Sequence, residues 1–106
     1  MKVLAVGKPA GCKLLRISAE LSRLPGGAIL LESISIHGDF FAIPEEKFED
    51  LEKRLGGHEL SLLAERYDAL IHEMGIQAIG ISGLGILSTI QGAIDETFFQ
   101  GIENRL

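Results

Sequence analysis

The feature that most constrains the fold is a strict alternation of apolar and polar residues from Leu15 to Ser22. Successive side chains of a strand point to opposite sides, so this period of two predicts a strand with one buried and one solvated face. A Pro-Gly-Gly turn at 25–27 follows, and a second apolar segment occupies 28–36. We therefore predict that the two segments pair as an antiparallel hairpin.

The second strand of this hairpin changes phase in its middle. Leu31 and Ile34 are three residues apart, whereas Ile34 and Ile36 are two apart. One extra residue in the strand would let the apolar residues on both sides of it face the core. We therefore predict a β-bulge near Glu32 and Ser33.

A helix is predicted after the hairpin. Pro44 is tolerated at a first helical position, and Glu45 and Glu46 then lie at the positive end of the helix dipole. We predict that the helix ends at Gly56-Gly57 through the left-handed conformation.

Two further segments carry apolar residues at helical spacing. The first covers 58–74 and stops at Gly75, and the second covers 83–96 with Ser82 as its N-cap. The tail at 97–106 is left without an assignment.

An apolar run at 1–6 supplies one more strand before the hairpin. The resulting β-β-β-α-α-α order predicts an α+β fold, a three-stranded antiparallel sheet with helices packed on one face in two layers. A length of 106 residues is typical of one domain, so 1–106 is predicted to fold as a unit.

Composition restricts the partners and the compartment. The net charge is −5 and the ten basic residues are scattered, which argues against nucleic acid and against anionic membranes. No apolar run approaches the roughly 20 residues that cross a bilayer, and the N-terminal run is too short for a signal peptide. We therefore expect a cytoplasmic protein. A single cysteine excludes an internal disulfide and the usual multi-cysteine zinc site.

The segment "GISGLG" resembles a nucleotide-binding glycine loop. Gly83 and Gly85 match the opening of a dinucleotide fingerprint, but the third position is Ser88. The segment also lies too close to the C-terminal end of the sequence for a second parallel strand. Glycines that permit close helix packing are the preferred interpretation.

Other reactive side chains are isolated. The three histidines share no i,i+3 or i,i+4 spacing, so no metal site is predicted. Cys12 has only Lys13 nearby to lower its pKa, which favours an incidental thiol over a nucleophile.

The junction "HGDFF" at 37–41 is the most unusual segment. Gly38 permits an unusual φ, and Asp39 is suited to accept hydrogen bonds in a turn. Phe40 and Phe41 are adjacent in extended backbone, so their rings should face opposite sides. One ring is therefore expected in the core and the other on the surface, available to a partner, with His37 beside it.

The sequence from about Lys2 to Ile94 resembles the C-terminal accessory domain of lipoate–protein ligases, which some organisms make as a separate small subunit. The most specific element is "IHGDFF" at 36–41 followed by "PEE" at 44–46. This sequence has "SGLG" at 82–85, where the family usually has a Ser-Pro-acidic helix start.

The resemblance implies a non-catalytic subunit, inactive alone. ATP, Mg²⁺ and lipoate would bind in the active site of a catalytic large subunit, which forms lipoyl-adenylate and lipoylates a lysine of an acceptor domain. This chain would bind none of these cofactors alone and would hold no metal and no catalytic residue. Its contact with the partner near the adenylate is expected at Gly38, Asp39, Phe40 and Phe41, with His37 beside them.

Two other functional classes remain open on the sequence alone. A scaffold or sulfur-acceptor protein of iron–sulfur assembly would require Cys12 to be exposed and reactive. A ligand-binding regulatory domain would use the "GISGLG" loop.

Overall fold

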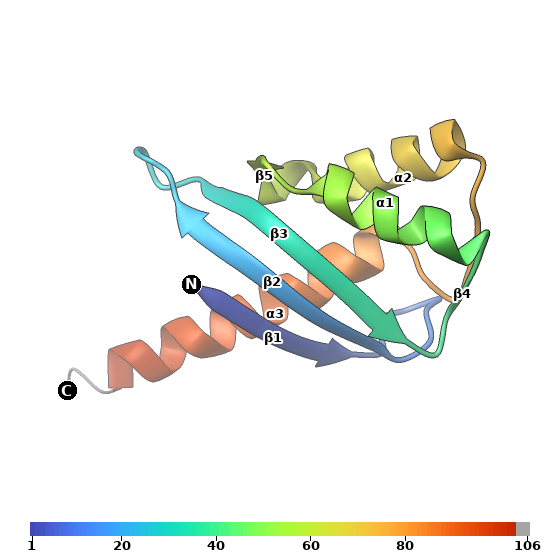
Figure 1. Cartoon of the computed structure of the whole chain (residues 1–106). Coiled ribbons are helices and arrows are strands. Elements are labelled where there is room, and N and C mark those ends of the chain that lie inside the picture. Colours follow the sequence, from blue (N-terminus) through green and yellow to red (C-terminus); the bar gives the residue numbers. More distant parts are fainter. Residues whose placement is uncertain (104–106) are drawn as a thin grey trace.

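The computed structural model describes the backbone of residues 1–103 and the side chains of residues 1–95. The helices and strands, in chain order, are β1 (Lys2–Gly7), β2 (Leu15–Arg23), β3 (Ile29–Gly38), β4 (Phe41–Ile43), α1 (Glu45–Leu55), β5 (His58–Glu59), a 3₁₀ turn (Leu60–Leu62), α2 (Leu63–Met74), β6 (Gln77–Ile79) and α3 (Gly83–Glu103). The long strands form one curved sheet, and the helices lie on one side of it (Figure 1). The predicted α+β class is confirmed.

The predicted hairpin forms the centre of the main sheet. The sheet is antiparallel with the order β1-β2-β3-β5, so the three predicted strands are joined by a fourth of only two residues. Alternate side chains of β2 are buried, as the period of two predicts; they are Leu15, Ile17, Ala19 and Leu21.

The predicted bulge lies in β3. Glu20 is opposite Ser33 and Leu21 is opposite Leu31, so Glu32 has no residue opposite it on β2. The extra residue lets Leu31 and Ile34 both face the core.

The first helix follows the prediction at its start and differs at its end. Pro44 immediately precedes α1, whose buried residues are Phe48, Leu51 and Leu55. Gly56 is extended with φ −70°, and the positive φ of 87° belongs to Gly57. A β-carbon at Gly56 would overlap the carbonyl oxygen of Glu32, so this end of the helix packs directly on the β3 bulge.

The second helix begins later than predicted. His58 and Glu59 pair with Leu31 and Leu30 as β5, and the α-helix starts only at Leu63. The prediction of a helix from His58 was wrong because these two residues pair with the edge of β3 and form a short strand. The predicted stop at Gly75 is confirmed by a left-handed φ of 65°.

The third helix has its predicted cap and extends further than predicted. The Ser82 hydroxyl accepts a hydrogen bond of 3.0 Å from the Gly85 backbone N–H, as an N-cap does. The helical backbone continues past Glu96 to Glu103. Side chains of the tail at 97–106 lie outside the described residues.

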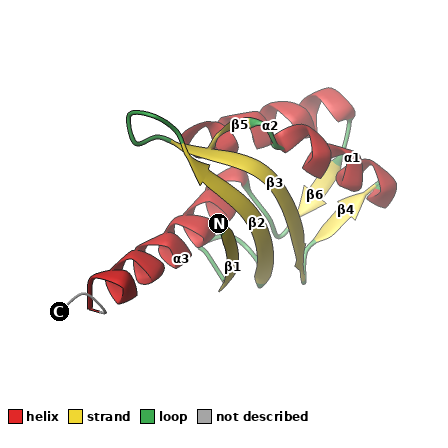
Figure 2. Cartoon of the chain, turned by 60° about the vertical axis from the view of Figure 1, so that its left-hand side comes forward, coloured by secondary structure: helices red, strands yellow, loops and turns green. Residues whose placement is uncertain are grey.

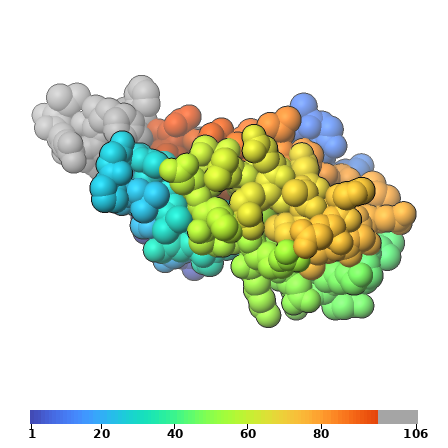
Figure 3. Space-filling model, turned by 90° about the horizontal axis from the view of Figure 1, so that it is seen from above, coloured from blue at the N-terminus to red at the C-terminus, as the bar shows by residue number. Residues whose placement is uncertain are grey.

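The three helices form the second layer. α1 contacts β3, α3 contacts β1 and β2, and α2 contacts both other helices. Figure 2 shows all three on one face of the main sheet, and Figure 3 shows α1 and α2 side by side from above. The core therefore lies between sheet and helices.

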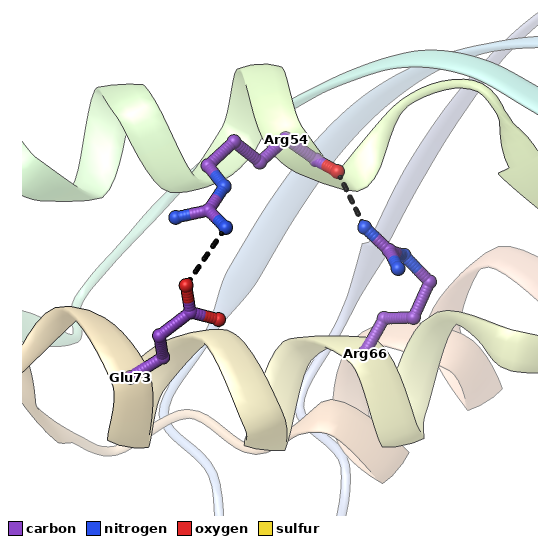
Figure 4. Close-up of polar contacts among 3 residues, drawn as sticks. All are labelled: Arg54, Arg66 and Glu73. Carbon is purple, nitrogen blue, oxygen red and sulfur yellow. Dashed lines mark hydrogen bonds and ion pairs between the residues drawn. The ribbon is translucent and has the colours of Figure 1, made fainter.

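Two arginines connect α1 with α2 at the surface. Arg54 forms an ion pair of 3.0 Å with Glu73, and Arg66 donates a hydrogen bond of 2.9 Å to the Arg54 carbonyl oxygen (Figure 4). The ion pair is largely exposed, so its contribution to stability is small.

A second, smaller sheet was not predicted. Strands β4 and β6 pair antiparallel, with Phe41 opposite Ile79 and Ile43 opposite Gln77. This two-stranded ribbon lies at one end of the main sheet (Figure 2). None of the described helices is both long and apolar enough to span a bilayer.

Candidate functional site

The turn after β3 depends on a close backbone approach. Gly38 has a φ of 149°, and a β-carbon there would overlap the carbonyl oxygen of Leu14. That oxygen accepts a hydrogen bond of 3.0 Å from the Asp39 backbone N–H. The predicted unusual φ of Gly38 is confirmed. The Asp39 backbone N–H joins the turn to the segment before β2.

The two phenylalanines separate as the extended geometry predicts. The Phe40 ring is partly buried, and its centroid lies 5.2 Å from that of Phe48. Phe48 in turn makes an edge contact with Tyr67 at 6.5 Å. Phe41 is 69% exposed. Phe40 therefore anchors the turn to the core, and Phe41 faces solvent.

The ribbon presents two more large apolar side chains beside Phe41. Ile43 is 60% exposed and Ile79 is 66% exposed, whereas Ala42 and Ala78 pack against the core. Side chains alternate along a strand, and Phe41 is directly opposite Ile79, so all three belong to one face. We call Phe41, Ile43 and Ile79 the apolar ribbon face. The sequence analysis did not identify Ile43 and Ile79 as site residues, although the apolar alternation at 41 and 43 and the apolar residues at 78 and 79 are visible in the sequence.

A hollow of about 470 Å³ lies between the end of β3, β4 and α1. Phe40 and Phe48 contribute aromatic walls, and His37 and Gly38 belong to its lining. Its carboxylates come from α1: Glu45, Glu46, Glu49 and Glu52. Three of the predicted site residues thus line one hollow, but the charge in it is predominantly negative.

Glu52 connects α1 with the free edge of β3. Its carboxylate accepts a hydrogen bond of 2.5 Å from the Ile36 backbone N–H. Burial raises the pKa of Glu52 above its usual value of 4.5, and this outweighs the opposing effects of the Ile36 hydrogen bond and His37. Glu49 raises the pKa further by like-charge repulsion.

This raised pKa predicts a pH-dependent difference between the wild type and Glu52→Gln. A folded-state pKa above the unfolded value means that the folded protein binds the proton more tightly, so stability falls as pH rises above 4.5 and through the folded pKa. Glutamine retains an acceptor oxygen for Ile36 and carries no charge. We expect the stability of Glu52→Gln relative to the wild type to increase as pH rises over this range, measured by urea unfolding. A difference that is independent of pH would contradict the prediction.

His37 lies on the exposed face of β3. Its Nε2 is 3.0 Å from the Ser35 hydroxyl, so the ring has a polar neighbour on its own strand. His58 is in β5, and His72 is exposed on α2. No group of three or more histidine, cysteine or acidic side chains in the described part of the chain is arranged to hold a metal ion.

The glycines of "SGLG" serve helix packing. A β-carbon at Gly83 would come 2.5 Å from the Ala64 carbonyl oxygen, and one at Gly85 would come 2.5 Å from the Cys12 sulfur. Cys12 is 8% exposed, and its Sγ is 3.5 Å from the Ser82 Oγ. These contacts favour the packing interpretation over a nucleotide loop. They also remove the exposure that a sulfur-acceptor role requires of Cys12.

A scan against protein-family models and a search of the curated proteins found no match. A search of solved structures found a chain from an archaeal lipoylation system, a bi-partite lipoate protein ligase and its E2 lipoyl domain from Thermoplasma acidophilum. The TM-score is 0.65 at 22% identity, over 85% of this chain and 94% of that chain. The resemblance predicted from the sequence is confirmed in the fold. At this identity the likeness establishes the fold, and any shared activity is a separate inference.

Proposed function

We propose that this chain is the accessory small subunit of a two-chain lipoate–protein ligase. The observation that carries the proposal is the structural match to nearly the whole of one chain from a bi-partite ligase system. The "IHGDFF" and "PEE" segments support it independently, because they carry the sequence resemblance and lie around one turn and one hollow.

The catalytic step is assigned to the large subunit. The hollow beside the turn is lined by four glutamates, and carboxylates repel the phosphates of ATP. The family resemblance assigns ATP, Mg²⁺ and lipoate to the partner's active site, where lipoyl-adenylate would form before transfer to an acceptor domain.

The accessory subunit acts by packing against the partner near the bound intermediate. Closing a site excludes water, strengthens its electrostatics and protects a reactive acyl-adenylate from hydrolysis. Phe41 supplies an apolar contact, Asp39 and His37 are polar neighbours, and Gly38 and Phe40 fix the shape of the turn. No bond is made or broken by these residues.

Reconstitution tests the proposal. The ligase large chain from the same genome is assayed for lipoate-dependent adenylate formation and for lipoylation of an acceptor domain, with and without this chain. We expect a stimulation of about tenfold or more, equivalent to about 1.4 kcal/mol in the activation barrier. This chain alone should be inactive. Equal activity of the large chain with and without it would overturn the proposal.

A further inference from the structure

We infer that the apolar ribbon face docks on the catalytic chain, at an apolar patch bordered by lysine or arginine. The inference rests on the proposed function and adds to it the face that binds and the chemistry of the surface that it meets. Phe41 belongs to the predicted loop, whereas Ile43 and Ile79 extend the contact to a second segment of the chain.

The first argument is the concentration of exposed apolar side chains on a very small sheet. Phe41, Ile43 and Ile79 are each at least 60% exposed, and the two strands have only three residues each. Their other face is held by Ala42 and Ala78 against the core. Clustered large apolar side chains on a soluble domain mark interaction surfaces, and a central aromatic residue is a common binding anchor.

The second argument is the charge around the apolar ribbon face. Asp39 precedes β4, and the exposed Glu45 and Glu46 follow it. Lys13 lies beside Gly80, next to β6, and is one neighbouring positive charge. The Lys47 ammonium donates a hydrogen bond to the Met74 carbonyl oxygen. Asp39, Glu45 and Glu46 outnumber Lys13 and Lys47, so the border is weakly net negative.

This charge discriminates between the two classes of occupant. A second copy of the chain would place acidic border against acidic border, and each copy carries a net charge of −5. A partner with lysine or arginine around an apolar patch would instead be attracted. Electrostatic complementarity thus favours the catalytic chain over self-association.

The molecule offers a matched control surface. Val6 is 68% exposed on β1, close to the exposure of Ile79, but it lies on the outer face of the main sheet, opposite Arg16. An aspartate at either position replaces an exposed β-branched side chain in a strand. The two variants therefore carry the same change in charge and a similar change in chemistry.

The experiment measures binding of the large chain by isothermal titration calorimetry to the wild type, Ile79→Asp and Val6→Asp. We expect Ile79→Asp to raise the Kd by about 30-fold or more, as loss of a central apolar contact does. The Kd of Val6→Asp should stay within about threefold of the wild-type value. Ile79→Ser replaces Ile79→Asp if the aspartate variant is unfolded by circular dichroism.

A third variant tests the charge of the border. Glu45→Gln with Glu46→Gln should slow association and flatten its dependence on salt, because these charges act mainly on the encounter rate. An unchanged rate and salt slope would overturn the basic border inferred for the partner.

The outcomes separate the two levels of the proposal. If the wild type binds and stimulates the large chain and Ile79→Asp does so equally well, the apolar ribbon face is not the docking surface, while the proposed function stands. If the wild type neither binds nor stimulates, the proposed function fails and the inference fails with it. If light scattering shows a wild-type dimer that Ile79→Asp dissociates, the occupant is a second copy and the inference is wrong.

Discussion

Replacing Gly38 with alanine should destabilise the folded state by about 3 kcal/mol, from backbone strain combined with overpacking. The φ of 149° is unfavourable for any residue with a side chain, and the added β-carbon would overlap the Leu14 carbonyl oxygen. That oxygen is a backbone atom in the loop before β2, so it cannot rotate away as a side chain would. Urea unfolding followed by circular dichroism measures the change.

Gly92→Ala is the matched control. Gly92 lies in α3, and a β-carbon there would meet nothing within 4 Å. Because alanine favours the helix, this variant should gain about 0.5 to 1 kcal/mol. A Gly38→Ala variant as stable as the wild type would show that the turn does not need the close approach to Leu14.

The same pair of variants connects stability with the proposed docking. Gly38 determines the path of the chain into Phe40 and Phe41, so a variant that folds with a shifted turn should also stimulate the large chain less. Gly92 is distant in sequence from the turn and lies on a helix that does not line the hollow. Its variant should stimulate as the wild type does.

Local patterns were sufficient to predict the larger elements. The alternation in 15–22 determined which side of β2 is buried, and the three-residue spacing of Leu31 and Ile34 located the bulge. Gly75 and Ser82 were reliable as helix stop and cap because capping depends on a few adjacent backbone groups. These features are encoded within a few residues of where they act.

Long-range pairing was not predictable from the same patterns. β5 forms because His58 pairs with Leu31 of β3. The two-stranded ribbon forms because Phe41 pairs with Ile79, which is 38 positions later in the sequence. Strands of two or three residues are too short to show a period. The neighbouring phenylalanines could be placed on opposite sides, but only the tertiary contact with Phe48 shows that Phe40 is the inner ring.

The hollow illustrates a further limit of sequence reasoning. Most glutamates of "PEEKFEDLE" are exposed, as is common for the charged face of a surface helix. Glu52 differs because α1 crosses the free edge of β3, where the Ile36 N–H needs an acceptor. Its raised pKa depends on that crossing, which no spacing within the helix reveals.

The "SGLG" segment shows why a glycine motif needs its tertiary surroundings. The sequence spacing of Gly83 and Gly85 is consistent with a phosphate-binding loop. In the fold, however, both glycines lie where α3 approaches Ala64 and Cys12. The packing interpretation has a direct consequence: Gly85 should be replaceable only if the Cys12 side chain becomes smaller, whereas Gly83 lies against the Ala64 backbone, which no substitution makes smaller.

Gly85→Ala and Cys12→Ala form a double-mutant cycle on that contact. A β-carbon added at Gly85 would come 2.5 Å from the Cys12 sulfur and 3.0 Å from Pro9, so the Gly85→Ala variant should lose about 2 kcal/mol by overpacking. Cys12→Ala removes the sulfur from a buried site and should lose about 1 kcal/mol through the cavity that it leaves.

Together the two changes should cost less than the sum of the single changes, by about 1 kcal/mol or more, because the new methyl group occupies the space that the sulfur vacated. Urea unfolding of the four proteins gives the coupling free energy. Strict additivity would mean that Gly85 is required for a reason other than Cys12, and the residual contact with Pro9 would become the first candidate.

In the ligase assay Cys12→Ala should stimulate the large chain as the wild type does, since the buried thiol has no part in docking. Loss of stimulation in a stably folded Cys12→Ala protein would return the thiol to consideration as a functional group.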